Sequence, residues 1–177
     1  HAAVAASVSS AVSSPLSAVP GRMWQTDKTV RALAYAKGVL FVGGSFTKVR
    51  PPGTSSGDVA EVAQPYLAAF RTSDLSLITD FHPVLAGPAP NAGAVQALDV
   101  SPDGTRLYVG GDFTTIDGVS RSKVAAYDLT NLNPAASPAT LPVLLTPMQF
   151  QASVSGRVYT LAATNESVYV GGTLTTA

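Results

Sequence analysis

The sequence Leu-Tyr-Val-Gly-Gly-Asp-Phe-Thr occupies residues 107–114, and related sequences occur at two other places in the chain. Residues 40–47 read Leu-Phe-Val-Gly-Gly-Ser-Phe-Thr, and residues 168–175 read Val-Tyr-Val-Gly-Gly-Thr-Leu-Thr. The period is about 65 residues. Self-similarity at a regular spacing is typical of repeat architectures, in which each repeat is one supersecondary unit. The glycine pairs indicate close approach of neighbouring backbone, and no helix-start pattern follows them as a phosphate-binding loop requires.

Each copy follows a matching Val-x-x-Leu segment, at residues 30–34, 95–99 and 158–162. In these segments a leucine alternates with smaller residues, the period-2 pattern of a strand. Residues 101–104, Ser-Pro-Asp-Gly, supply a hairpin turn between two such runs. We therefore expect each Val-x-x-Leu strand to pair antiparallel with the Gly-Gly strand after it, in an all-β protein with almost no helix.

More of the unit repeats outside this core. Residues 67–70 match residues 124–127 as a third strand, and a bulky aromatic residue precedes each Val-x-x-Leu segment. The predicted units span about 24–80, 81–149 and an incomplete 150–177. Six apolar residues at equivalent positions are predicted to be buried: Leu33, Leu98, Leu161, Val42, Val109 and Val170.

The Gly-Gly motif, Gly118-Val119-Ser120-Arg121 and Val124-Ala125-Ala126-Tyr127 together resemble the delta-60 type repeat of secreted, often actinobacterial, proteins. The turn at Ser101-Pro102-Asp103-Gly104 followed by Leu107-Tyr108-Val109 also resembles YVTN-type propeller repeats. The resemblance implies about two and a half blades of a β-propeller in a secreted or cell-surface bacterial protein, often one fused to carbohydrate-binding or fibronectin-like modules. It implies little about activity, because propellers support many unrelated functions.

Propellers usually have about 4–8 blades of four strands. The two and a half units seen here would leave an open sheet edge, which is an aggregation liability. We therefore expect the fold to be a fragment of a larger propeller, closed by further residues of its own chain or by neighbouring subunits.

The composition limits the partners. Charged residues make up 12% of the chain, and 11 basic residues balance 11 acidic ones. A neutral chain lacks the electrostatic footprint of nucleic-acid binding or of an anionic membrane surface. The serines of the uncharged segment 1–20 argue against membrane insertion, so we interpret this segment as a linker or lead-in, with a pairing strand as the alternative. There is no cysteine, which excludes disulfides and thiolate sites.

The sequence contains neither a nucleophile elbow, nor a His-Glu-x-x-His motif, nor a P-loop. His1 and His82 are the only histidines, and no cofactor is expected. Asp112 and Asp117 are weak candidates for a metal site, because calcium prefers several oxygen ligands. The alternative is structural, with Asp117-Gly118 as a turn and Asp112 bonded to nearby backbone or to Arg121.

Four aromatic residues could stack on sugars or instead pack between blades: Trp24, Tyr35, Tyr66 and Tyr127. The favoured hypothesis is a non-catalytic extracellular scaffold or binding module, with polysaccharide or other extracellular proteins as partners. The alternatives are a carbohydrate-binding or carbohydrate-processing module of a larger secreted enzyme, and a surface-layer or filament subunit that assembles through open strand edges.

Overall fold

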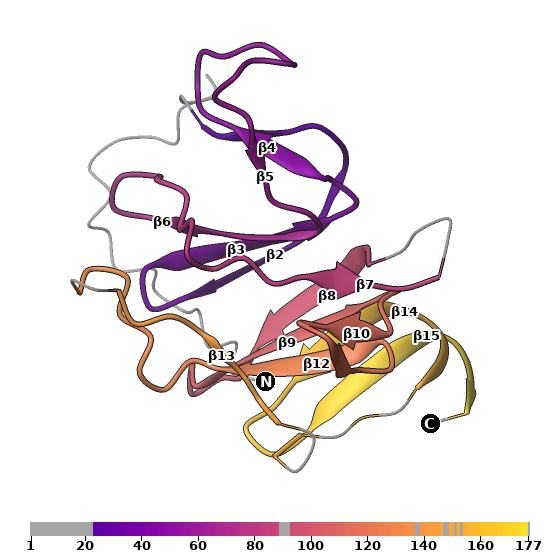
Figure 1. Cartoon of the computed structure of the whole chain (residues 1–177). Helices are drawn as coiled ribbons and strands as arrows, with labels where there is room; N and C mark the ends of the chain where they lie inside the picture. The colour runs from indigo at the N-terminus through magenta and orange to yellow at the C-terminus, as the bar shows by residue number, and fades with distance from the viewer. Residues whose placement is uncertain are drawn as a thin grey trace, which may run out of the picture.

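The protein is all-β, as the sequence predicts. The computed structural model describes residues 23–88, 93–136, 139–146, 149–150, 152 and 154–176, and this part of the chain contains antiparallel strands and no helix (Figure 1). The lead-in at residues 1–20 lies outside the described residues. Turns and irregular loops join the strands, in keeping with the frequent glycine and proline.

The first repeat unit forms two sheets. The first sheet has the order β2 (Val30–Ala36), β3 (Val39–Gly44) and β6 (Leu67–Arg71), all antiparallel. A small sheet is formed by β1 (Gln25–Thr26), which precedes β2, and by β4 (Lys48–Arg50) and β5 (Val62–Ala63), which lie between β3 and β6 in the chain.

The second unit repeats this plan. The second sheet has the order β8 (Val95–Val100), β9 (Arg106–Gly111), β12 (Val124–Asp128) and β13 (Val143–Leu144). Its small sheet is formed by β7 (Leu85–Ala86), which precedes β8, and by β10 (Thr115–Ile116) and β11 (Val119–Ser120), which lie between β9 and β12 in the chain. The third sheet is the hairpin of β14 (Ser155–Ala163) and β15 (Val168–Thr176). Every Val-x-x-Leu strand pairs antiparallel with the following Gly-Gly strand, so the predicted pairing is confirmed.

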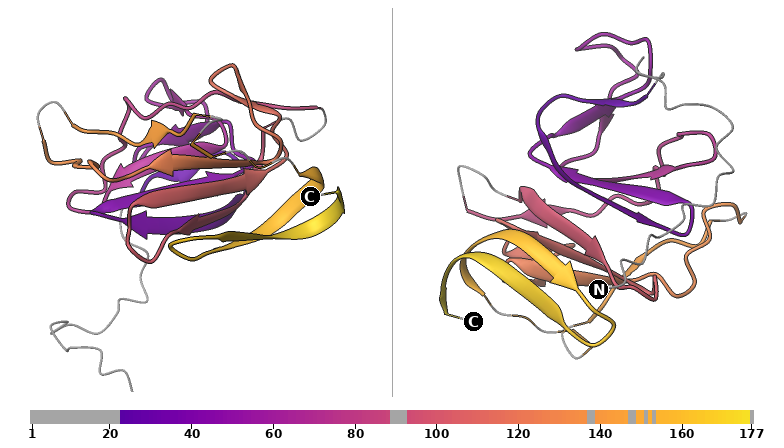
Figure 2. Two further views of the ribbon diagram at one scale, coloured as in Figure 1. Left: turned by 90° about the horizontal axis from the view of Figure 1, so that it is seen from below. Right: turned by 180° about the vertical axis from the view of Figure 1, so that it is seen from behind.

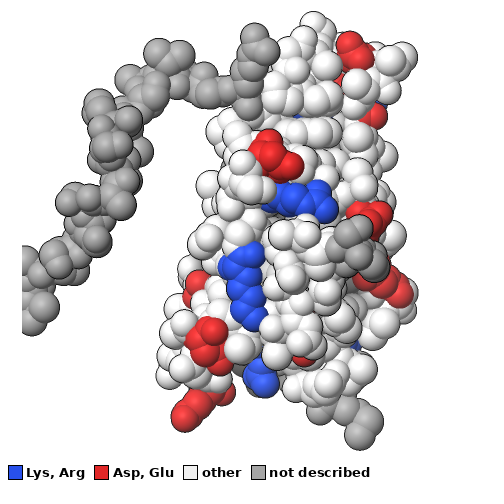
Figure 3. All heavy atoms as spheres, turned by 90° about the vertical axis from the view of Figure 1, so that its left-hand side faces the viewer, with Lys and Arg blue, Asp and Glu red and all other residues white. Residues whose placement is uncertain are grey.

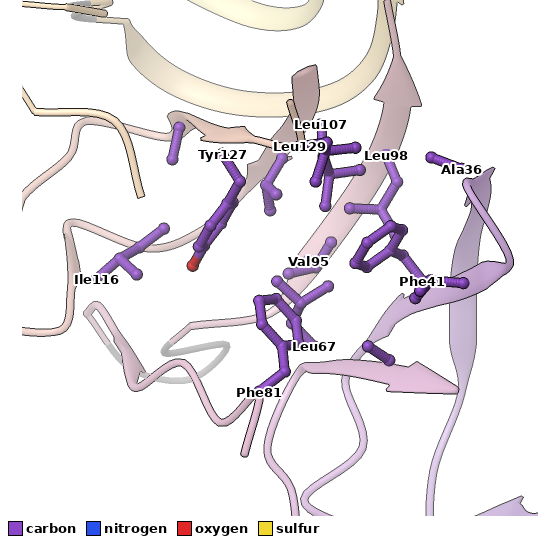
Figure 4. Packing of buried hydrophobic residues seen from close by; sticks show 14 of the residues in the cluster. Ala36, Phe41, Leu67, Phe81, Val95, Leu98, Leu107, Ile116, Tyr127 and Leu129 are labelled. Atoms are coloured by element: carbon purple, nitrogen blue, oxygen red, sulfur yellow. The ribbon is translucent and has the colours of Figure 1, made fainter. Parts of the chain in front are cut away.

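The three main sheets stack face to face in chain order. Strand β8 packs against β2 and β3 on one side, and β14 packs against β8 and β9 on the other (Figures 1 and 2). The largest apolar cluster lies between the first and second sheets, where Phe41 and Leu67 meet Val95 and Leu98 (Figure 4). This burial removes apolar surface from water and is the main stabilising term of the stack.

In the first two Gly-Gly pairs, the first glycine is where the next sheet approaches. A Cβ on Gly43 would lie 2.5 Å from Val95 Cγ1, and a Cβ on Gly110 would lie 2.7 Å from Val158 Cγ1. Glycine is therefore required there for close packing between sheets rather than for an unusual φ angle.

The predicted burial of the repeated apolar residues holds fully in the middle sheet and for Val42 of the first sheet. Leu98, Val109 and Val42 are buried, and Leu161 and Val170 are half-buried. Leu33 is 60% exposed, so that prediction is wrong. The reason is physical: Leu98 packs on Gly43 of the preceding sheet, whereas none of the described sheets covers the side of the first sheet on which Leu33 lies.

Candidate functional site: an apolar groove on the first sheet

A groove of about 550 Å³ lies on the face of the first sheet that points away from the second sheet. Its lining is mainly apolar, with three polar side chains at one side. The lining residues are Met23, Trp24, Gln25, Thr26, Val30, Leu33, Leu40, Val42, Arg50, Phe70 and Leu75. Concave apolar surfaces with a few placed polar groups are the usual form of a binding site.

The small sheet of the first unit positions the polar side of the groove. β1 pairs with β4 so that Gln25 lies opposite Arg50, and Arg50 Nε donates to Gln25 Oε1 at 2.8 Å. The next turn is fixed by Asp27, whose carboxylate accepts from the backbone N–H groups of Thr47 and Lys48 at 2.7 and 3.0 Å. Partial burial raises the pKa of Asp27, but hydrogen bonds from Thr47 and Lys48 outweigh it and lower that pKa overall.

The aromatic side of the groove is formed by Trp24, which is half-buried. Its ring packs on Phe70 with 6.0 Å between centroids and 50° between planes. The equivalent aromatic residue of the second unit, Phe81, packs edge-to-face on Tyr127 with 5.6 Å between centroids. The groove thus occupies the face of the first sheet that corresponds to the face of the second sheet packed on the first. No sheet among the described residues covers it.

The first metal candidate, Asp112, holds two sheets together. Its carboxylate is 3.0 Å from Arg157 Nε at the start of the third sheet, and it accepts from Gln96 Nε2 at 3.3 Å. Arg121, its expected partner, instead donates to the carbonyl oxygens of Ser120 and Leu145.

The second candidate, Asp117, forms the predicted turn with Gly118 between β10 and β11. Both residues have positive φ, 51° and 76°, as a two-residue hairpin turn of this type requires. Its carboxylate accepts from the backbone N–H of Val84 at 2.8 Å. The two carboxylates have different partners, and no group of three or more metal-ligating side chains occurs in the described part of the chain.

Two buried polar residues, Gln64 and Arg121, have a shared role that the sequence did not predict. Gln64 donates to the carbonyl oxygens of Leu67 at 2.8 Å and Phe81 at 3.0 Å, and Arg121 donates to that of Leu145. Both residues stand three positions before the third strand of their unit. In both cases a donated hydrogen bond connects the segment before that strand to a segment that follows the strand in the chain. This shared spacing is the sequence signal that identifies them.

Among the described residues, the remaining candidates lie outside the lining of the groove, apart from Trp24. His82 Nε2 lies 2.8 Å from the carbonyl oxygen of Ala63, and His1 lies outside the described residues. Tyr127 is buried and Tyr66 half-buried, while Tyr35 is 62% exposed and lies outside the lining of the groove. Burial raises the pKa of the Tyr127 phenol, with a further contribution from Asp117. Of the four aromatic candidates, the groove uses Trp24.

The charged side chains do not gather by sign on the face drawn in Figure 3, where most of the surface is uncharged. None of the described residues belongs to a helix with the length and apolar character needed to cross a membrane.

No protein-family model matches the chain, and neither a curated protein nor a solved structure matches it. The geometry of the groove and of the sheet stack is therefore the basis for a function.

Proposed function

We propose that this chain is a non-catalytic β-propeller scaffold, secreted or displayed at a cell surface, that acts by binding through its exposed sheet faces. The supporting observation is the contact between successive sheets, which occurs twice with the same residue types. Val95 and Leu98 pack on Gly43, and Val158 and Leu161 pack on Gly110. A radial array of blades is built by repeating one such contact around an axis.

Binding fits the groove better than catalysis. Among its described lining residues there are polar groups that donate and accept hydrogen bonds, Gln25, Thr26 and Arg50, but no carboxylate or histidine that would act as a general acid or base. The other lining residues are apolar, and they suit a partner that covers the sheet face and removes this apolar surface from water.

Carbohydrate binding is the second candidate. Trp24 offers an aromatic surface beside the Gln25 amide and the Arg50 guanidinium, and these groups together stack on and hydrogen-bond to sugars. Filament or surface-layer assembly is the third. β3 and β9 pair on both sides, whereas β15 pairs only with β14 among the described strands, which leaves an edge for strand addition.

Two measurements test the proposal. Electron microscopy of the purified protein should show sheets arranged around a central axis, as an arc or a ring; an elongated stack with no common axis would contradict the propeller. Titration with oligosaccharides at a fixed protein concentration, monitored by the fluorescence of Trp24, distinguishes the carbohydrate alternative. A saturable change in Trp24 emission that Arg50→Ala weakens would favour that alternative over a scaffold that binds proteins, because Arg50 lies in the lining of the groove and its removal keeps the fluorophore.

A further inference from the structure

We infer that two copies of this chain associate head to tail, with the third sheet of one copy covering the groove on the first sheet of the other. The inference rests on the proposed function and names the partner of its binding face. Successive sheets within the chain make the same contact twice, and the two outer sheets each expose one side of that contact.

The contact between sheets has a protruding half and a receiving half. The protruding half is the Val-x-x-Leu strand, and the receiving half is the first glycine of the preceding Gly-Gly strand. A Cβ on Gly43 would lie 3.2 Å from Leu98 Cδ1, and a Cβ on Gly110 would lie 3.1 Å from Leu161 Cδ1. The two contacts within the chain therefore share one register.

In the part of the chain that the structure describes, one copy of each half is open. Val30 and Leu33, the protruding pair of the first sheet, are 39% and 60% exposed. Gly171 is the receiving glycine of the third sheet, and a Cβ there would meet only Thr160 Cγ2 of the paired strand, among the described residues. The chain thus presents both halves of the interface that it makes twice internally.

Aromatic residues show the same complementarity. Phe41 of the first sheet packs on Phe81 with 5.9 Å between centroids, and Tyr108 of the second sheet packs on Phe150 at 5.6 Å. The equivalent of Phe41 and Tyr108 in the third sheet is Tyr169, which is 64% exposed. In a head-to-tail pair, Tyr169 of one copy would pack on the ring of Trp24 of the other.

A second copy suits this face because an occupant must present glycine where Val30 and Leu33 project and an aromatic ring where Trp24 lies. The third sheet of the same chain has these features in Gly171 and Tyr169. The contact is heterologous, so it closes into a ring or continues as a filament according to the rotation between copies. An equivalent blade from a longer polypeptide is the competing occupant.

The first test uses cross-linking, since the chain has no cysteine of its own. Val30→Cys combined with Gly171→Cys should form disulfides between copies on mild oxidation, giving species of two or more chain masses on a non-reducing gel. The matched control joins Val30→Cys to Glu166→Cys, because Glu166 lies in the exposed turn before β15. Cross-linking of the Gly171 pair that is no faster than that of the control would overturn the inference.

The second test avoids a change at Gly171. Trp24 is the single tryptophan, so its emission reports the groove. As the concentration of the unmodified protein rises, Trp24 emission should shift to shorter wavelength and the mass in sedimentation should increase. Tyr169→Ala should raise the protein concentration at which both changes occur at least tenfold. A monomer with constant Trp24 emission at all concentrations would overturn the inference. That result would leave the scaffold proposal standing, since the axis seen by microscopy and the oligosaccharide titration test it separately.

Discussion

Leu98 and Leu33 occupy the same position in successive repeats, yet Leu98 is 9% exposed and Leu33 is 60% exposed. The strands around them pair in the same way, including a bulge at the same point of each hairpin. The difference comes from the neighbouring sheet: Leu98 packs on Gly43, and Leu33 faces the open groove. In this stack, the strand pairing comes from within a unit, but the core is made between units.

Removing the two leucines should therefore have unequal effects. Leu98→Ala should destabilise the protein by about 2–5 kcal/mol, because it deletes a buried side chain and leaves a cavity. Leu33→Ala should cost well under half as much at low protein concentration, since water already reaches that side chain. Urea denaturation of both variants measures the two losses. Equal losses would show that the face of the first sheet is covered in solution.

The glycines sharpen the same comparison. Gly110→Ala should destabilise by about 1–3 kcal/mol, because the added methyl group would be forced against Val158 and Leu161. Gly171→Ala should cost less, since its described close contact is the methyl group of Thr160 in an exposed strand region. Thermal unfolding at low concentration provides the measurement, and the reverse ranking would contradict the assignment of buried and open faces.

The polar link between the second and third sheets should contribute less. Asp112→Asn removes the ion pair with Arg157, whose side chain is 42% exposed, so we expect a loss below about 1 kcal/mol. Added salt should narrow the difference between the variant and the unmodified protein. A loss of several kcal/mol, insensitive to salt, would mean that the carboxylate has a buried partner besides Arg157 and Gln96.

The smallest effect concerns the turn between β8 and β9. A hydrogen bond from Ser101, followed by those from Thr105, lowers the pKa of Asp103 below its usual value. Asp103 therefore stabilises the fold above its unfolded pKa of about 3.9, and this contribution is lost as the pH falls through the lower folded pKa. The advantage of the unmodified protein over Asp103→Asn in melting temperature should be present at pH 6 and shrink toward pH 3. An unchanged difference would contradict it.

Much of the fold could be predicted from local sequence. The Val-x-x-Leu and Gly-Gly segments lie next to each other along the chain, so their pairing follows from strand alternation and short turns. The Asp117–Gly118 turn was predictable for the same reason, because its φ angles depend on two adjacent residues.

The groove was not predictable, because it depends on which sheets have neighbours. Leu33 has the sequence environment of a core residue and became exposed through the arrangement of whole units. The Asp112–Arg157 ion pair joins residues 45 positions apart in different units, and no pattern within a repeat indicates it. The equivalence of Gln64 and Arg121 was missed because the loops before them differ in length.

The central claim is that the Val-x-x-Leu strand of one sheet packs on the first glycine of the preceding sheet. An engineered disulfide tests this contact directly. A Cβ on Gly43 would lie 3.1 Å from Val95 Cβ, close to the separation of about 3.5–4.5 Å that a disulfide needs. The variant with Gly43→Cys and Val95→Cys should form its disulfide within one chain, so that it runs at one chain mass on a non-reducing gel and has no free thiols. Free thiols that persist in the folded variant after treatment with an oxidant would contradict this packing.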